Sequence, residues 1–361
     1  MRICINLPGT IEYGLFSPER GESRWSQNLA YVLASRDWNV WCTSVACPSW
    51  GNKFDKTPTN VVKNIKFCTL FEAKEESKKE EFDILFDTSW FHPGMTNFYK
   101  DFETKVFIHG HWGGCCYEEP GRFPGHNHYI AYPNLQVAAG MTHCSFKHLG
   151  KHLFVPIPLL RERNIGGDRK GIVWGIREGF FARKGKRLID RALFLLKFLS
   201  EYADSDYVLY IMNSNEMFNA PENDKIIVES GVLNWIKEAK NVVLLDKTPY
   251  DEVLDILAKS VLLIRTGDPP GAPLEYEAIS QGCLPVIWKG GCNVFERYYD
   301  TFGLTLSDEG IDDNSPILFE KLRVLVESEP VRKELLRISE GELLVHYDYD
   351  FIEGQLKEVI R

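Results

Sequence analysis

With 361 residues, 44% of them hydrophobic and 26% charged, the chain is long enough for two domains and too ordinary in composition for a disordered or low-complexity protein. Its net charge of −9 arises entirely after residue 160, where 26 basic residues face 35 acidic ones, because the first 160 residues carry 16 of each. Neither half has the broad basic surface of a nucleic-acid binder, and no window approaches the roughly eighteen apolar residues of a membrane span.

The start of the chain, MRICINLPGTIEYG, predicts a first strand. Its apolar run is too short for a signal peptide and no small-residue cleavage site follows. The nine cysteines are odd in number, scattered and without a CxxC pair, which indicates reduced, mostly buried thiols and therefore a cytoplasmic protein. The adjacent Cys115 and Cys116 are either ordinary loop residues or a redox-active pair.

The first half alternates strands with helical stretches. Strand signals fall at Arg2–Leu7, Asn39–Ser44, Ile65–Leu70, Asp83–Asp87, Lys105–His109 and Met141–Ser145. Between the first two lies Gly21–Arg36, in which Trp25, Leu29 and Leu33 recur at helical spacing. This rhythm predicts a parallel sheet with helices on its faces.

The rhythm restarts after the charged, Pro- and Gly-bearing segment FVPIPLLRERNIGGDRKG. The second set of signals comprises strands at Gly171–Gly175, Tyr207–Met212, Val242–Leu245, Val261–Ile264 and Leu284–Trp288, and helices near 187–202, 224–239, 249–259 and 273–282. We therefore expect two Rossmann-like parallel-sheet domains, 1–158 and 159–345, facing across a cleft, with ligands at the carboxyl ends of the strands. The sequence of residues 346–361 predicts a terminal helix, which we expect to pack back on the N-terminal domain.

The segment GDPPGAPLEYEA, which follows an apolar strand, predicts a ligand held at a helix start. Pro273 suits the first turn of a helix, and Gly271 and Ala272 leave the backbone open to close approach. Free N–H groups and the helix dipole favour phosphate at such a position. Glu275 and Glu277 would repel phosphate, so hydroxyl groups of a sugar fit them better. A diphosphate joined to sugars meets both demands.

A basic cluster follows the first strand of the second half, in GIREGFFARKGKRL. It consists of Arg177, Arg183, Lys184, Lys186 and Arg187. One interpretation is a solvated loop that balances nearby acids. The other is that Arg177 and Lys184 neutralise a bound diphosphate.

These motifs, in this order, resemble retaining glycosyltransferases of family 4, which have the GT-B fold. The resemblance covers most of the chain and rests on the loop that contains Gly9, the helix start RGESRWSQNLA, the strand end VFIHG, the GIR and Lys184-Gly185 pair, and EAISQGCLPVI. The last segment is fairly specific, whereas each of the others is weak alone.

The resemblance implies that the first domain binds the acceptor and the second binds the nucleotide-sugar donor. The implied donor-binding residues are Gly9, Asp268, Gly271, Ala272, Pro273, Leu274 and Glu277, with Arg177 and Lys184 stabilising the leaving group. The family's first glutamate falls at Pro269 here, so a one-residue insertion would make Asp268 its counterpart. GIR also extends the usual GR. Glu275 is interpreted as a salt-bridged surface acid or as a residue that supports Glu277.

Eight of the nine histidines lie between residues 92 and 152. The pairs His109/His111 and His126/His128 are compatible with zinc, but no third ligand follows at a known spacing, so we expect no metal. The resemblance places His109 beside the transferred sugar. The alternative is that this histidine has only a structural role. Trp112 is a candidate acceptor contact, since sugars stack on such rings.

The predicted function is transfer of a sugar from a nucleotide diphosphate sugar, with UDP- and GDP-sugars as candidate donors, to a glycan or other hydroxyl acceptor. The configuration would be retained, with no cofactor. Three alternatives stay open. They are an epimerase or phosphorylase of the same fold, a catalytically degenerate protein that binds glycan or nucleotide, and a phage-type DNA-base glucosyltransferase, against which the neutral first half argues.

Overall fold

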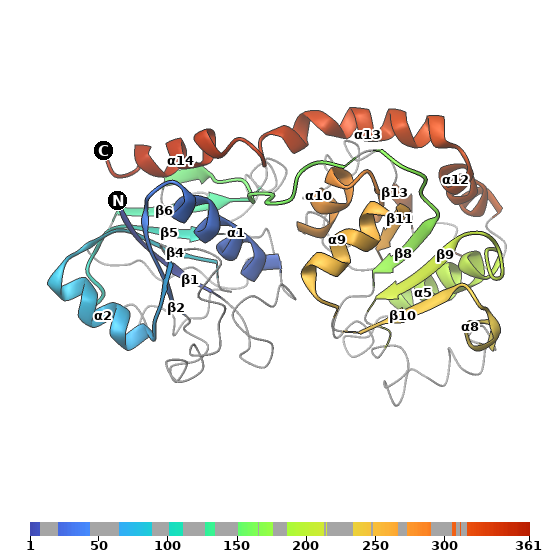
Figure 1. The fold of residues 1–361 in the computed structure, drawn as a ribbon, viewed down its shortest axis with the longest axis horizontal. Coiled ribbons are helices and arrows are strands. Elements are labelled where there is room, and N and C mark those ends of the chain that lie inside the picture. Colours follow the sequence, from blue (N-terminus) through green and yellow to red (C-terminus); the bar gives the residue numbers. More distant parts are fainter. Residues whose placement is uncertain are drawn as a thin grey trace. The chain divides into compact units, whose positions relative to one another are not determined.

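The structure, a computed structural model, describes residues 1–7, 21–43, 65–88, 101–110, 127–133, 151–164, 166–175, 186–212, 214, 234–246, 248–265, 273–289, 305–307, 311 and 316–361. The chain divides into two compact units (Figure 1). The N-terminal unit comprises Met1–Arg161 and Leu344–Arg361, and the C-terminal unit comprises Glu162–Leu343. Each unit has its own parallel sheet.

The N-terminal unit contains a seven-stranded sheet in the order β3-β2-β1-β4-β5-β6-β7. Its elements are β1 (Arg2–Asn6), α1 (Gly21–Ser35), β2 (Asn39–Thr43), β3 (Ile65–Phe67), α2 (Leu70–Lys79), β4 (Phe82–Asp87), β5 (Thr104–Gly110), β6 (Asn127–Tyr132), β7 (Lys151–Phe154) and α14 (Tyr349–Glu358). All described strand pairs in this sheet are parallel.

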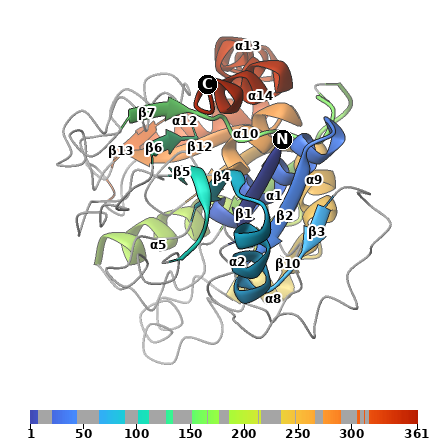
Figure 2. The same ribbon diagram turned by 90° about the vertical axis from the view of Figure 1, so that its left-hand side faces the viewer.

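Alternate residues of these strands enter two hydrophobic layers. Ile3 and Ile5 of β1 pack with α1 and α14 on one face, whereas Cys4 packs with α2 on the other face (Figure 2). Strands covered on both faces are expected to be apolar along their buried length. In β1, RICIN, all five residues are buried, and the three central ones are apolar. The two covered faces leave the strand ends as the part of the sheet that a ligand can approach.

The terminal helix α14 belongs to the N-terminal unit. Its Ile352 and Leu356 are fully buried in the same layer as α1. The Trp38 indole nitrogen donates to Glu353 at 2.8 Å, and His346, just before the helix, lies 2.8 Å from the carbonyl oxygen of Ile157 through Nδ1. Burial lowers the pKa of His346 to about 4, so this imidazole is neutral at physiological pH.

The C-terminal unit contains a six-stranded sheet in the order β10-β9-β8-β11-β12-β13. Its elements are β8 (Gly171–Gly175), α5 (Lys186–Ser200), β9 (Val208–Met212), α8 (Asn234–Glu238), β10 (Val242–Leu245), α9 (Tyr250–Ala258), β11 (Ser260–Arg265), α10 (Pro273–Ser280), β12 (Leu284–Lys289), β13 (Thr305–Ser307), α12 (Pro316–Glu327) and α13 (Glu329–Leu344).

Helices cover both faces of this sheet as well (Figure 1). On one face, α5 and α12 pack on Trp174 and Ile264. On the other, α9 and α10 pack on Val173 and Leu263, with the methyl group of Ala278 in the contact. The two parallel-sheet α/β domains expected from the sequence are therefore confirmed.

One predicted strand is longer than the observed one, and three observed strands were not predicted, for local reasons. The strand expected over Ile65–Leu70 ends at Phe67, because Thr69 and Glu72 form a capping box that starts α2. Strands β6, β7 and β13 were not predicted. The sequence of β6, NHYIAY, is too polar to signal a buried strand, and β7 and β13 are only four and three residues long. The strand expected at Met141–Ser145 lies outside the described residues, as do residues 224–233 of the expected helix 224–239. Within the described part of the chain, no helix is long and apolar enough to cross a membrane.

Candidate functional site

The strand order of the C-terminal unit places a ligand crevice beside β8. From β8 the chain proceeds to β9 and β10 on one side, and it then returns to β11 on the other. At such a reversal the connections after the two central strands diverge, and ligands of parallel sheets bind there, outside the carboxyl ends. Gly175 and Arg265, the last residues of β8 and β11, are register partners, so the segments that follow them start side by side.

These two segments contain most of the residues predicted to bind the donor. Residues 176–185, after β8, include Arg177 and Lys184, and residues 266–272, after β11, include Asp268, Gly271 and Ala272. All of these residues lie outside the described ones. The strand order thus brings together the starting points of two predicted motifs that are about ninety positions apart in the sequence.

Helix α10 begins at Pro273, as its position predicts, and carries two buried carboxylates. Glu275 and Glu277 are each 1% exposed, and Leu274 is half-buried. The interpretation of Glu275 as a surface acid is therefore wrong. Its carboxylate lies 2.9 Å from the guanidinium of Arg265, and the two side chains are only 2% and 13% exposed. A buried carboxylate is costly unless a cation is near, and β11 supplies that cation at its last residue.

We expect Glu277→Gln to weaken donor binding by about 1.5–3 kcal/mol, the range for hydrogen bonds to a charged group. Glu275→Gln should instead act mainly on stability, because Glu275 is already paired with Arg265. Calorimetric titration with UDP, beside urea unfolding of both variants, separates the two effects. A larger loss of affinity in Glu275→Gln would reverse the assignment.

The N-terminal unit has an equivalent reversal between β1 and β4. Asn6, the last residue of β1, donates through Nδ2 to Oδ1 of Asp87, the last residue of β4, at 2.7 Å. Both side chains are 1% exposed. Gly9 follows β1 but lies outside the described residues. The carboxyl edge of this sheet therefore presents an amide and a carboxylate at its centre.

His109 lies on the neighbouring strand β5 at the same edge. It is 4% exposed and is the register partner of Asp87. The next residue must be small, because a Cβ on Gly110 would lie 2.7 Å from a methyl group of Thr88 and 2.8 Å from the Trp25 ring. The N-terminal part of α1 lies against this edge, since the hydroxyl groups of Ser26 in α1 and Thr88 after β4 are 2.6 Å apart.

The sequence analysis singled out His109 but not the polar side chains at the same edge of the sheet. Asn6, Asp87, Thr88 and Ser26 were not singled out, although Asp87 carried a usable signal. It ends the apolar run ILF, and a carboxylate at the carboxyl end of a buried strand is where parallel sheets place functional groups. The other three are ordinary polar residues whose proximity depends on strand order.

The histidine-rich region is described only in part. Burial lowers the pKa of His128 to about 4, and its ring lies 5.2 Å from that of Phe107. Trp112, His111 and His126 lie outside the described residues. Among the residues that the structure describes, no group of three His, Cys, Asp or Glu side chains could hold a metal.

The cysteines that the structure describes are buried thiols, namely Cys4, Cys42, Cys68 and Cys283. Burial raises their pKa values, that of Cys68 to about 12. They are therefore protonated and unreactive at neutral pH. Cys115 and Cys116 lie outside the described residues.

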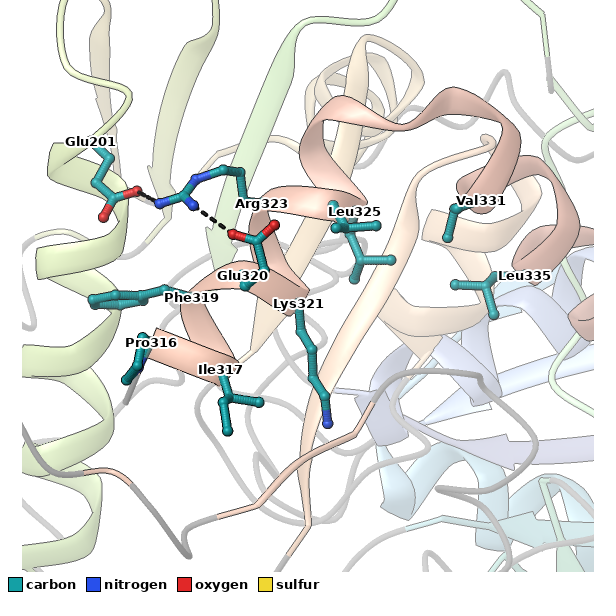
Figure 3. A pocket seen from close by; sticks show the side chains of 11 residues that line it. Glu201, Pro316, Ile317, Phe319, Glu320, Lys321, Arg323, Leu325, Val331 and Leu335 are labelled. Atoms are coloured by element: carbon teal, nitrogen blue, oxygen red, sulfur yellow. Dashed lines mark hydrogen bonds and ion pairs between the residues drawn. The ribbon is translucent and has the colours of Figure 1, made fainter. Parts of the chain in front are cut away.

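A separate hollow of about 900 Å³ lies in the C-terminal unit, among α12, α13 and the end of α5 (Figure 3). Its walls are largely apolar, with Ile317, Phe319 and Leu335 among them. Arg323 on its rim is already paired with Glu201 at 2.9 Å and with Glu320 at 2.6 Å. No strand end contributes to the described lining. A diphosphate needs converging donors, so this hollow does not fit the donor.

Comparison with known proteins identifies the fold. No model of a protein family matches the sequence, and no curated protein matches it either. Solved structures do match. A glycosyltransferase from Rickettsia africae aligns over 99% of this chain and 97% of its own, at 13% identity and a TM-score of 0.63. A putative UDP-N-acetylglucosamine 2-epimerase from Listeria monocytogenes aligns over 100% and 96%, at 12% identity and a TM-score of 0.61.

An alpha-glucosyltransferase solved in complex with UDP aligns over 100% of this chain and 99% of its own, at 15% identity and a TM-score of 0.58. At these identities the similarity shows the fold alone. The chain has the two-domain α/β fold of these enzymes, GT-B, as the sequence predicts.

Proposed function

We propose that the protein is a retaining glycosyltransferase of family 4 type that transfers a sugar from a nucleotide diphosphate sugar, with UDP as the favoured nucleotide, to a hydroxyl acceptor. The observation that carries the proposal is the reversal at β8 and β11, where the basic segment 176–185 and the segment before α10 begin at register partners. Similarity to a glycosyltransferase solved with UDP supports the choice of donor. The buried thiols support a reducing compartment, the cytoplasm.

The proposed mechanism depends on stabilising the leaving diphosphate, which is the main electrostatic demand of the reaction. Arg177, Lys184 and the N–H groups at the start of α10 would stabilise the negative charge of the departing phosphate. Gly271 and Ala272 would let it approach the backbone, and Asp268 and Glu277 would accept hydrogen bonds from donor hydroxyls. In the N-terminal unit, His109 would contact the transferred sugar and Trp112 the acceptor.

Product analysis tests the reaction class. Purified protein is incubated with UDP-glucose, UDP-N-acetylglucosamine or GDP-mannose, with or without a set of glycan acceptors, and products are followed by NMR. A new glycosidic bond with the anomeric configuration of the donor, together with free nucleoside diphosphate, supports the proposal. Inverted product would refute retention, and binding without turnover of any donor would indicate a degenerate protein.

An epimerase is the second candidate, because one of the matched structures is a putative UDP-N-acetylglucosamine 2-epimerase. In the same assay an epimerase converts the UDP-sugar to its 2-epimer without an acceptor. Sugar 1-phosphate formed only when free phosphate is added would indicate a phosphorylase. Glucosylation of duplex DNA would indicate a DNA-base transferase.

We expect His109→Ala to lower turnover about a hundredfold, the effect of removing one group that contacts the transition state. Nucleotide affinity should stay near that of the wild type, because all the proposed donor-binding residues except Gly9 lie in the C-terminal unit. Initial rates at saturating donor, measured beside UDP titrations, give both quantities. Wild-type turnover in the variant would assign His109 a structural role.

We also expect activity without a divalent metal. Arg177, Lys184 and the start of α10 would supply the positive charge that a metal provides in metal-dependent transferases. Activity in excess EDTA should stay within about twofold of the untreated rate, equivalent to ~0.4 kcal/mol in the barrier. Activity lost in EDTA and restored by manganese or magnesium would contradict the expectation and direct attention to the histidine-rich region.

A further inference from the structure

Arg169 links the segment that enters the C-terminal unit, just before β8, to the carboxyl end of α10. The guanidinium of Arg169 donates through Nη1 to the carbonyl of Ala258, at the end of α9, at 2.6 Å, and to the carbonyl of Gln281, at the end of α10. Through Nη2 it donates to the carbonyls of Asn164 at 2.9 Å and Gly166 at 3.0 Å. One planar cation thus joins two helix ends and the entering segment.

The surrounding residues are shaped for this contact. Gly282, next to the end of α10, has φ of +72°, and a Cβ there would lie 2.8 Å from Nη2 of Arg169. The entering segment makes further hydrogen bonds to the same end of the helix. The backbone N–H of Asn164 donates to the Ser280 carbonyl at 2.9 Å, and Nε2 of the Gln281 side chain donates to the Glu162 carbonyl at 3.2 Å.

Helix α10 is short enough for its two ends to be mechanically linked. Its eight residues span about 12 Å at the usual rise per residue, and Glu275 and Glu277 are its third and fifth residues. A displacement of the carboxyl end therefore moves both carboxylates. Because Glu275 must stay within reach of Arg265 on β11, the position of the whole helix is constrained.

We propose that Arg169 is a positioning residue for the donor site. Arg169 holds α10 in the place where Glu275 pairs with Arg265 and where Glu277 lies at the edge of the sheet. The role in donor binding rests on the function proposed above. The positioning itself does not.

Arg332 provides a matched control in the same unit. It is also a half-buried arginine, and its Nη1 donates to the carbonyls of Leu325, at 2.8 Å, and Val326 in α12. Desolvation lowers the pKa of both arginines. The difference is that Arg332 holds α12, whereas Arg169 holds α9 and α10.

The first test measures amide hydrogen exchange without ligand, by mass spectrometry, in Arg169→Gln, Gly282→Ala and Arg332→Gln. The two changes at the Arg169 contact are expected to speed exchange tenfold or more along α10, including Leu274–Ala278, while Arg332→Gln leaves α10 unchanged. The proposal would be overturned if Arg169→Gln left the exchange rate at Leu274–Ala278 unaltered. It would also be overturned if Arg332→Gln increased that rate as much as Arg169→Gln does.

The second test measures the Kd for UDP in the same variants and in Arg169→Lys. Arg169→Gln is expected to bind at least tenfold more weakly and Arg332→Gln like the wild type. Lysine keeps the charge near the two helix ends, but its compact ammonium lacks the planar fork with which arginine reaches carbonyls of separate segments, so Arg169→Lys should recover thermal stability without recovering affinity. Recovery of both would contradict the bridging role. If the wild type binds no nucleotide, the proposed function fails, while the exchange test still decides the positioning role.

Discussion

Replacing Arg265 with methionine is expected to lower the free energy of unfolding by about 3–5 kcal/mol, the range for removing one partner of a buried ion pair. Arg265 lies 2.9 Å from Glu275, whose side chain is only 2% exposed. Methionine has a similar length but no charge, so it leaves the carboxylate buried without this cation. Part of the loss should be recovered in the double variant Arg265→Met/Glu275→Gln, because the buried charge is then removed as well.

Urea unfolding followed by circular dichroism measures the effect. Arg337→Met is the matched control, since Arg337 pairs with Glu334 at 2.7 Å while both side chains are largely exposed. An exposed pair contributes little to stability, so this control should unfold at the wild-type urea concentration. If Arg265→Met unfolds there too, the buried pair does not stabilise the unit and α10 is held by other contacts.

Replacing Arg177 or Lys184 with alanine is expected to weaken UDP binding by about 2–5 kcal/mol, the range for truncating one partner of a buried charge pair. This corresponds to a Kd raised roughly thirtyfold to several thousandfold. Both residues lie in the segment that follows the carboxyl end of β8, at the reversal of strand order. An anionic diphosphate bound there needs cations that face it.

Lys170 is the control because it precedes β8, at the opposite edge of the same strand, and is exposed. Lys170→Ala removes the same charge from the unit and should leave the Kd for UDP unchanged. Titration calorimetry of all three variants gives the comparison. Wild-type affinity in both Arg177→Ala and Lys184→Ala, or an equal loss in Lys170→Ala, would contradict a diphosphate site at this edge.

The sequence by itself determined the elements that carry the fold. Apolar runs such as Gly171–Gly175 and Val242–Leu245 match strands residue for residue, and Pro273 marks the first residue of α10. These signals are local, since an apolar run or a proline restricts the few residues around it. Two alternating series of strands and helices were therefore sufficient to predict two parallel sheets.

Only the tertiary structure decided which polar groups meet. Asn6 and Asp87 are 81 positions apart and share a hydrogen bond, Arg169 reaches Gln281 across 112 positions, and Glu275 is buried against Arg265 on the neighbouring strand. The first two pairings leave no periodic trace, because they depend on the order of the strands. The third depends on how α10 packs beside β11. Strand order is a property of the whole sheet, and it is the reversals at β1 and β8 that turn separate local motifs into candidate sites.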